Sequence, residues 1–312
     1  MGASHVPEGH SIHRLARQLG DLFAGQRLHV TSPQGRFAAG AAVLDGRVLT
    51  RARAHGKHLY LDFAAPGEPG DVVVMHSHLG IYGAWSFAGD EQFAAASSIG
   101  APRRVGERES GSAEDSAVAY DDAGRVVPEP PVGAVRARLA GEHGWADLRG
   151  PALCTVETPQ EARAAEAKLG PDPLDPQADP EPFLRAAAKS KRAIGVLLME
   201  QNVVSGIGNI FRAESLFRRG VNPMTPGTSL TREDLLGLWE ENVTLMAVGV
   251  RVGRIITTDP ADRLGIPDTE AWPEHANYVY HRHGQPCLRC GTTVLKRDLN
   301  GRGLYWCPSC QA

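Results

Sequence analysis

Two short cysteine motifs near the end of the chain, Cys287-Leu-Arg-Cys290 and Cys307-Pro-Ser-Cys310, contain four of its five cysteines. Sixteen residues separate the two motifs. This spacing can bring four thiolates to the corners of a tetrahedron, which is the geometry of structural zinc sites. Because all four positions are thiolates, no coordination position remains for a reacting water. The motifs therefore predict one structural Zn²⁺, with a tetrathiolate iron site as the alternative.

The residues between the two motifs, 292–306, have the pattern of a β-hairpin that turns at Asn300-Gly301. The basic side chains of this hairpin are Lys296, Arg297 and Arg302. Residues 277–312 hold five Lys and Arg against the single acidic residue Asp298. A zinc-stabilised basic hairpin is typical of a nucleic-acid-binding finger, and a ribbon that only docks on its own domain is the alternative.

Upstream of the hairpin, the glycine-rich segment Ser205-Gly-Ile-Gly-Asn209 lies between two predicted helices, over 191–201 and 210–219. Amide N–H groups at the start of a helix attract anions, and Asn209 adds a side-chain donor. A phosphate-bearing partner would fit this turn. An interhelical turn without a ligand is the alternative.

The first half of the chain has a different pattern. Apolar residues at three- and four-residue spacing predict an amphipathic helix over 8–23. Short β-like runs separated by Gly, Pro and Asp follow it, at 28–31, 47–53, 58–63, 72–76, 134–139 and 146–148. A Pro-rich segment at 171–176 marks the predicted domain boundary, and a capping-box pattern at 231–234 starts the longest predicted helix.

Residues 88–130 interrupt the strand pattern. They hold nine acidic residues, four arginines and clusters of Gly, Ser, Ala and Pro, with almost no apolar periodicity. Such a segment cannot bury enough apolar surface to offset the entropy of ordering it. We therefore predict a disordered surface insertion.

The composition of the 312-residue chain is that of a globular protein of about two domains, with 42% hydrophobic and 22% charged residues. The net charge of −3 gives by itself no indication of a nucleic-acid partner. No apolar run approaches the ~20 residues of a membrane span, and the first thirty residues lack an apolar export core. We expect a cytoplasmic protein without a membrane partner, in which the lone Cys154 is a buried apolar residue.

Pro7-Glu8-Gly9-His10 precedes the first predicted helix, and with it the chain resembles the formamidopyrimidine-DNA glycosylase and endonuclease VIII family. The motifs that carry this resemblance are Pro-Glu-Gly at 7–9, Gly56-Lys57, His78-Leu-Gly-Ile-Tyr-Gly83, Leu169-Gly-Pro-Asp-Pro-Leu174, Leu197-Leu-Met-Glu-Gln201, Ser205–Asn209 and Gly301-Arg302 leading into the second cysteine motif. They span the chain outside 88–130. The Pro-Glu-Gly start is similar to endonuclease VIII, above all its actinobacterial type, rather than to the Pro-Glu-Leu start of the formamidopyrimidine branch.

The resemblance implies an α+β fold: an N-terminal β-sandwich with flanking helices, then a helix–two-turn–helix domain and a β-hairpin zinc finger. We expect these at 7–175, 176–274 and 275–312. The implied partner is damaged double-stranded DNA, bound between the domains by a monomer. The implied place of action is the nucleoid in the bacterial cytoplasm.

Four residues match the family's catalytic positions. The resemblance makes the amine of Pro7 the nucleophile, and a chain-terminal amine titrates at ~7.7–8.0, well below the ~10.4 of lysine. Glu8 would protonate O4′ of the sugar during ring opening. Lys57 would hold phosphate and assist β-elimination, and Arg302 would clamp a phosphate and support δ-elimination.

Other positions match DNA contacts of the family. Lys168 and Asn209 match residues that contact the DNA backbone. The loop Gly80-Ile81-Tyr82 matches the wedge that fills the space of a nucleotide flipped out of the duplex. Endonuclease VIII has a glutamine where Gly80 stands, so one hydrogen-bonding residue for readout of the opposite base is missing.

The residue before Pro7 conflicts with this chemistry. Pro7 follows Val6, and a nitrogen in an amide bond cannot act as a nucleophile. GUG codes for valine internally and also serves as a bacterial start codon. We expect translation to start at position 6 and the starting methionine to be removed; a cloning remnant is the alternative.

The sequence thus predicts a bifunctional DNA glycosylase and AP lyase of base excision repair, with oxidised pyrimidines as the first substrate class. A glycosylase for 8-oxoguanine or formamidopyrimidine is one alternative. A non-catalytic zinc protein that binds damaged DNA is the other, but simple binding needs neither a terminal amine nor Glu8. The sequence does not reveal the preferred base.

Overall fold

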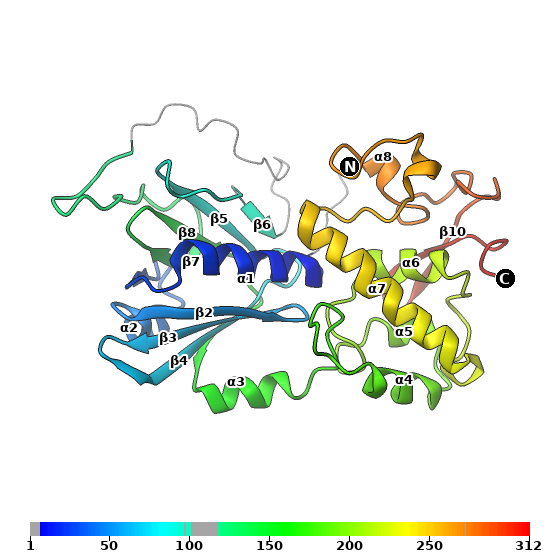
Figure 1. Ribbon diagram of the computed structural model, residues 1–312, viewed down its shortest axis with the longest axis horizontal. Coiled ribbons are helices and arrows are strands. Elements are labelled where there is room, and N and C mark those ends of the chain that lie inside the picture. Colours follow the sequence, from blue (N-terminus) through cyan, green and yellow to red (C-terminus); the bar gives the residue numbers. More distant parts are fainter. Residues whose placement is uncertain (1–6, 97, 101–117, 272) are drawn as a thin grey trace. The chain divides into compact units, whose positions relative to one another are not determined.

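The computed structural model describes residues 7–96, 98–100, 118–271 and 273–312 (Figure 1). The chain divides into two compact units. The first contains Pro7 and Ser11–Glu166, and the second contains Glu8–His10 and Ala167–Ala312. The boundary along the chain therefore falls before the Pro-rich segment, ahead of the position expected after residue 175.

The first unit is a sandwich of two antiparallel sheets, as expected. One sheet has the strand order β1 (His29–Thr31), β7 (Val135–Ala140), β8 (Gly144–Arg149), β5 (Ala84–Gly89) and β6 (Ser98–Gly100). The other has the order β2 (Val48–His55), β3 (His58–Ala65), β4 (Glu68–His78) and β9 (Leu153–Glu157). Three helices accompany the sheets: α1 (Gly9–Phe23), α2 (Ala38–Leu44) and α3 (Pro159–Glu166).

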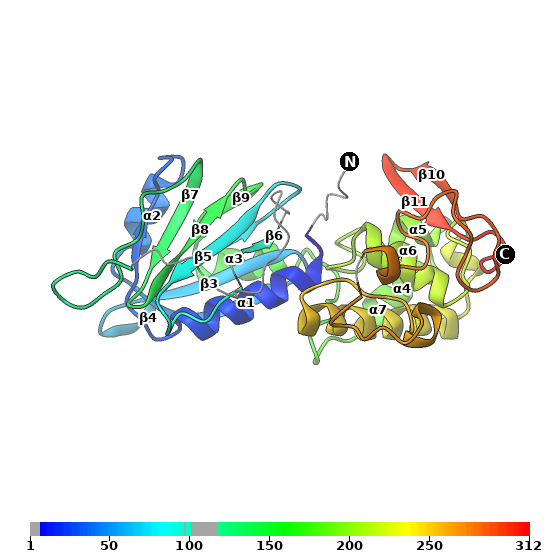
Figure 2. The same cartoon turned by 90° about the horizontal axis from the view of Figure 1, so that it is seen from above.

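Helix α1 owes its position to its apolar stripe. Ile12, Leu15, Leu19 and Phe23 are buried in one core with side chains of both sheets, as their three- and four-residue spacing predicts. Figures 1 and 2 show α1 running along the sandwich. The same core holds Leu61 from one sheet and, from the other sheet, further strand residues: Trp85, Leu139 and Leu148.

The predicted disordered insertion over 88–130 is wrong at both of its ends. Phe93 and Ile99 are buried in the core of the sandwich, and β6 pairs with β5. Val126 packs on Ala140 and Trp145. Isolated apolar residues fix these segments, and isolated residues give no periodicity to read. The middle of the predicted insertion, 101–117, lies outside the described residues.

The second unit is helical and ends in a hairpin. Its helices are α4 (Glu181–Ala188), α5 (Ile194–Leu197), α6 (Asn209–Arg218), α7 (Arg232–Val252), α8 (Pro273–Ala276) and the 3₁₀ turns η1 (Gly227–Ser229) and η2 (Pro260–Arg263). The hairpin consists of β10 (Leu295–Leu299) and β11 (Arg302–Trp306), as expected. The predicted capping box before α7 is confirmed, since Thr231 and Asp234 bond reciprocally.

The helix predicted over 191–201 is shorter than expected. Only Ile194–Leu197 is α-helical, because the amides of Ile194 and Gly195 donate to the carbonyls of Thr225 and Pro223. These bonds tie the segment to the neighbouring loop. Among the described residues, no helix has both the length and the apolar character needed to cross a membrane.

Candidate functional site

The start of α6 is capped by a side chain from the other end of the chain. The carboxylate of Glu8, which is only 2% exposed, accepts hydrogen bonds from three backbone amides. The donors are the amides of Gly208, Ile210 and Phe211, at 2.9, 2.8 and 3.3 Å. A carboxylate at this place is stabilised by the N–H groups and by the helix dipole. The prediction of a phosphate at these amides is therefore wrong, because the Glu8 carboxylate already accepts their hydrogen bonds.

The glycines of the turn permit this approach. A Cβ on Gly208 would lie closer to the Glu8 carboxyl carbon than van der Waals contact allows. The amide of Gly9 also donates to the carbonyl of Gly206, at 2.8 Å. The Gln201 side chain holds the turn from the other side, accepting from the Gly206 amide and donating to the carbonyl of Ile207, both at 3.0 Å. The turn thus fixes Glu8, the residue that directly follows the buried Pro7.

Asn209 is oriented by an arginine that the sequence analysis did not single out. The Arg212 guanidinium donates to Asn209 Oδ1 at 3.3 Å and to the carbonyl of Gly303 in β11 at 2.9 Å. Arg212 is only 1% exposed. Burial, opposed by the attraction of Glu8 and aided by repulsion from Arg302, lowers its pKa to about 10. A charged residue inside the otherwise apolar start of α6 is the signal that could have revealed it.

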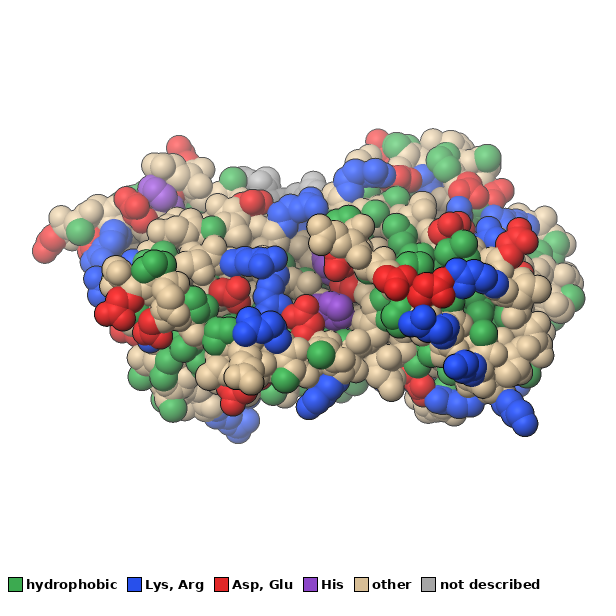
Figure 3. All heavy atoms as spheres, turned by 60° about the horizontal axis from the view of Figure 1, so that its bottom comes forward, with side chains coloured by type: hydrophobic (Ala, Val, Ile, Leu, Met, Phe, Trp, Pro, Cys, Tyr) green, Lys and Arg blue, Asp and Glu red, His purple; other side chains and the backbone are tan. Residues whose placement is uncertain are grey.

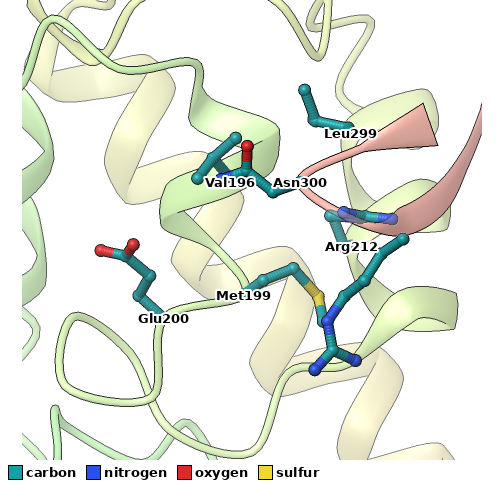
Figure 4. A pocket seen from close by; sticks show the side chains of 7 residues that line it. Val196, Met199, Glu200, Arg212, Leu299 and Asn300 are labelled. Carbon is teal, nitrogen blue, oxygen red and sulfur yellow. The ribbon is translucent and has the colours of Figure 1, made fainter. Parts of the chain in front are cut away.

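Arg212 also lines a small pocket of about 170 Å³ in the second unit. Figure 4 shows its lining side chains, which come from α5 and the turn after it, from α6 and from the hairpin: Val196, Met199, Glu200, Arg212, Leu299, Asn300 and Arg302. Arg302 is exposed and directly follows the Asn300-Gly301 turn, where both residues have positive φ, 54° and 73°. The pocket therefore joins one buried and one exposed guanidinium.

Lys168 belongs to the same unit and is exposed. It lies two residues before Gly170, whose amide donates to the carbonyl of Gln201 at 2.8 Å. The Ser205 hydroxyl donates to the carbonyl of Gly170 at 2.5 Å. The backbone after Lys168 is thus bonded to the turn that carries Asn209.

The four cysteines of the finger are placed for one metal ion. Their sulfur atoms all lie within 4.8 Å of one another. Cys290 and Cys307 Sγ are 3.5 Å apart, and Cys287 and Cys310 Sγ are 3.9 Å apart. Zinc–sulfur bonds of ~2.3 Å in a tetrahedron give sulfur separations of about 3.8 Å. The donor set and its spacing fit one structural Zn²⁺.

A buried carboxylate attaches the finger to α6. Glu214 accepts hydrogen bonds from the amides of Tyr278, Val279 and Tyr280 at 2.8, 2.9 and 2.7 Å, and from the Thr257 hydroxyl. The helix that carries Asn209 and Arg212 therefore also holds the segment leading into the finger. No local sequence pattern indicates this role of Glu214.

The remaining predicted residues lie in the first unit. Lys57 is half-buried in the two-residue turn between β2 and β3. The wedge loop, which we define as Leu79–Gly83, leaves Ile81 53% and Tyr82 81% exposed. Its Gly80 has φ of +65°, and a Cβ there would meet the Cβ of Ala152 at 2.8 Å. Both observations explain why a glycine, rather than a larger side chain, stands at this position.

Charge on the surface is mixed. On the face that Figure 3 shows, Lys and Arg side chains alternate with Asp and Glu over the described residues. A chain with a net charge of −3 would thus recognise a polyanion through a few well-placed cations rather than through its overall field.

Family models match three segments of the chain. Residues 6–122 match the formamidopyrimidine-DNA glycosylase N-terminal domain, 169–261 match the formamidopyrimidine-DNA glycosylase H2TH domain, and 284–312 match the zinc finger found in FPG and IleRS. Together they cover the sandwich up to β6, the glycine-rich turn and the cysteine motifs.

Relatives and solved structures agree with these matches. Endonuclease 8 1 of Mycobacterium tuberculosis is 39% identical over 310 residues, covering 98% of this chain and 100% of the relative. Formamidopyrimidine-DNA glycosylase of Geobacillus kaustophilus is 40% identical over 145 residues, 46% of this chain and 52% of that one. The Lactococcus lactis Fpg in complex with abasic-site DNA has the same fold, with a TM-score of 0.70 at 18% identity over 98% and 99% of the two chains. By its three domain matches and its full-length relative, the chain belongs to the formamidopyrimidine-DNA glycosylase and endonuclease VIII family.

Proposed function

We propose that this protein is a bifunctional DNA glycosylase and AP lyase of base excision repair. The observation that carries the proposal is the buried Glu8, which directly follows Pro7 and is fixed by the amides of Gly208, Ile210 and Phe211. Family membership supports the same activity. A protein that only bound DNA would not need a buried carboxylate adjoining a potential amine nucleophile.

The proposed reaction starts at the nitrogen of Pro7. Its lone pair attacks C1′ of the flipped nucleotide, the C1′–N bond forms, and the bond to the damaged base breaks with the electron pair leaving on the base. Opening of the O4′–C1′ bond then gives an iminium ion. Because a secondary amine leaves no N–H in that iminium, the cation persists as the electron sink for strand cleavage.

Glu8 has a defined part in this sequence. Its three N–H donors hold it as a carboxylate, so it must take up a proton before it can give one. The ammonium formed when Pro7 attacks C1′ is the source of that proton, and O4′ is its destination as the sugar ring opens. Glu8 thus returns to its starting form.

Strand cleavage requires positively charged side chains near the phosphate groups that leave. Loss of a C2′ proton expels the 3′ phosphate in β-elimination, and a second elimination expels the 5′ phosphate. We assign Lys57 to the first step and Arg302 to the second. Arg212 supports Arg302 by bonding the adjacent Gly303, and Asn209 and Lys168 bind the DNA backbone.

The wedge loop supplies the group that replaces the flipped nucleotide. Ile81 and Tyr82 are exposed apolar side chains, which gain burial only when they enter a base stack. With Gly80 in place of a hydrogen-bonding residue, we expect weak discrimination of the base opposite the lesion.

Oxidised pyrimidines are the proposed substrate class, because the relative that aligns over its full length is an endonuclease 8. Purine lesions such as 8-oxoguanine are the second candidate, favoured by the match of residues 6–122 to the formamidopyrimidine-DNA glycosylase N-terminal domain. We place the activity at the bacterial nucleoid, where such lesions arise. Cleavage of defined lesions opposite each of the four bases separates the two candidates.

Borohydride trapping on abasic DNA tests the proposed chemistry. Protein that begins at Pro7 should form a trapped adduct and leave phosphate at both ends of the gap. Protein that retains residues 1–6 should bind the DNA without an adduct, since amide resonance occupies the Pro7 lone pair. Intact mass and N-terminal sequencing identify each form. Equal trapping by the verified long form would exclude Pro7 and point to a lysine, with Lys57 the first to test.

A further inference from the structure

The outer face of the four-stranded sheet carries a row of imidazoles that the proposed mechanism does not use. In the register of β3 and β4, His58 lies opposite His78 and Tyr60 lies opposite His76. Side chains two residues apart on a strand share a face, so all four lie together. The neighbouring Leu59 points into the core instead.

Hydrogen bonds order three of these groups into a chain. Glu157 Oε1 and His76 Nδ1 are 2.9 Å apart, and His76 Nε2 and His58 Nδ1 are 2.8 Å apart. A carboxylate can only accept, so His76 Nδ1 carries the hydrogen. Neutral His76 then accepts at Nε2, and His58 donates from Nδ1. Every bond points toward Glu157, which leaves the lone pair of His58 on Nε2.

His78 is fixed in the other tautomer. Its Nδ1 accepts a hydrogen bond from the Gly80 amide at 3.0 Å, so neutral His78 carries its hydrogen on Nε2. The rings of His58 and His78 are 4.8 Å apart between centroids. A donor imidazole and an acceptor imidazole thus stand side by side, and His58 directly follows Lys57 in the chain.

The two imidazoles differ in what a proton would do. A proton on His58 Nε2 breaks no hydrogen bond, and the resulting cation is stabilised through His76 by the charge of Glu157. A proton on His78 Nδ1 would set two N–H groups against each other at Gly80. Of this pair, only His58 can become charged without rearrangement.

The groups around His58 keep it neutral in the free protein. Burial, with repulsion from His78, His76, His55 and Lys57, lowers the pKa of His58 to about 3. The other charged or titratable groups on this face and on the helix that covers it are Arg51, Arg53, Tyr60, Asp62, Glu157, Glu161, Arg163 and Glu166. Arg53 pairs with Glu166, which leaves Glu157 as the acid joined to the chain.

A bound phosphate would change this balance. A negative charge about 4 Å from an imidazole, at an effective dielectric of ~20, favours the protonated form by roughly a thousandfold. This effect is comparable with the whole lowering of the His58 pKa from 6.5 to about 3. We propose that His58, supported by His76 and Glu157, takes up a proton when a DNA phosphate binds beside Lys57 and His78, so that DNA binding is linked to proton uptake. This inference rests on the proposed function, which brings a DNA backbone to Lys57.

Calorimetric titration with an uncleavable abasic-analogue duplex tests the linkage. Binding heats in two buffers of different ionisation enthalpy give the number of protons taken up. Uptake should be about half a proton at pH 6, rise toward one proton near pH 5 and decline toward zero at pH 8. His58→Gln should remove that proton. The matched control is His143→Gln, which removes another histidine paired with a carboxylate, Asp90, at 3.1 Å, and should leave uptake unchanged.

The isosteric variant Glu157→Gln tests the chain itself. It should reduce proton uptake at about pH 6 while leaving affinity at pH 8 near that of the unmodified protein, because only the cation depends on the carboxylate. Nitrogen NMR of the His58 ring provides a reading that needs no variant: one protonated nitrogen in the free protein, and two in the complex.

The outcomes separate the two proposals. Failure of the unmodified protein to bind the duplex would contradict the proposed function. Tight binding with equal proton uptake by the unmodified protein and His58→Gln would overturn the linkage alone. So would a His58 ring that keeps one proton in the complex throughout this pH range.

Discussion

Two glycine-containing segments, one in each unit, carry candidate functional residues, and they are built in opposite ways. The turn at 205–209 is almost entirely buried, and the amides at its end are bonded to Glu8. The wedge loop holds Ile81 and Tyr82 in solvent. A group that moves a proton must stand in one place, whereas a group that replaces a base must be free to enter the stack. In the proposed function, the turn is already fixed before DNA arrives, and the loop would gain its packing from DNA.

The sharpest way to break the fixed segment is Gly208→Ala. The added methyl group has no room beside the Glu8 carboxyl group, so the carboxylate must leave the amides of α6. A displacement of about 1 Å in a catalytic group can cost about 100-fold. We expect borohydride trapping and strand cleavage to fall by at least that factor.

Gly70→Ala is the matched control, since a Cβ there would meet nothing within 4 Å. Its activity should stay within about twofold of the unmodified protein. Thermal unfolding of both variants shows whether Gly208→Ala remains folded. A folded Gly208→Ala variant with full activity would mean that the amides of α6 do not position Glu8 for the reaction.

Loss of the finger should affect the fixed segment and spare the wedge. Cys307→Ser removes one thiolate ligand, and without zinc the hairpin loses the bond from Arg212 to Gly303. We expect affinity for abasic DNA to fall by about 10- to 100-fold, with metal analysis showing less than one Zn per chain. Cys154→Ser, which lies outside the finger, should keep both the affinity for abasic DNA and one Zn per chain. Unchanged affinity in the metal-free protein would remove the finger from DNA binding.

The open segment is tested by Tyr82→Ala. Because Tyr82 is 81% exposed, its loss should leave thermal stability unchanged and reduce cleavage of damaged duplex by about tenfold, the value of one lost base–aromatic contact. Leu264→Ala removes a side chain of the second unit that is 91% exposed and should change neither quantity. A loss of stability in Tyr82→Ala would show that the wedge loop packs on the protein.

The same contrast explains what the sequence could and could not predict. The helix over 8–23, the capping box at Thr231 and the turn at Asn300-Gly301 follow from neighbouring residues, and each is present. The bonds of Glu8 join residues 200 or more positions apart along the chain. No local pattern indicates such a pairing, so the sequence of the glycine-rich turn predicts a site for an external anion.

Buried charge was missed for a related reason. In the sequence of α6, Arg212 and Glu214 stand among apolar residues. Composition alone does not distinguish a buried charge from a surface charge. Their partners come from β11 and from 278–280, which only the folded chain brings near. The exposed side chains of the predicted wedge require no partner within the chain, so a family motif alone is enough to predict them.

The smallest expected effect concerns the hydrogen bond that holds the wedge loop to its strand. Neutral His78 accepts from the Gly80 amide at Nδ1, and a proton there would abolish the bond. Burial, with Lys57 and His76 adding repulsion, lowers the pKa of His78 from its ordinary value of 6.5. A histidine with a lower pKa in the folded protein stabilises the fold above pH 6.5 and loses that contribution as the pH falls below it.

The Gly80 amide should therefore become less protected on acidification. Between about pH 7 and pH 5, its hydrogen-exchange protection factor, corrected for the intrinsic rate, should fall by about two- to fivefold. Amides in the buried turn at 205–209 provide the internal control, since their acceptors do not include a histidine. Gly80 protection that stays constant over this range would mean that His78 remains neutral throughout. An equal decline in both segments would instead report general loosening of the protein, and the distinction between a fixed turn and an adjustable loop would then be lost.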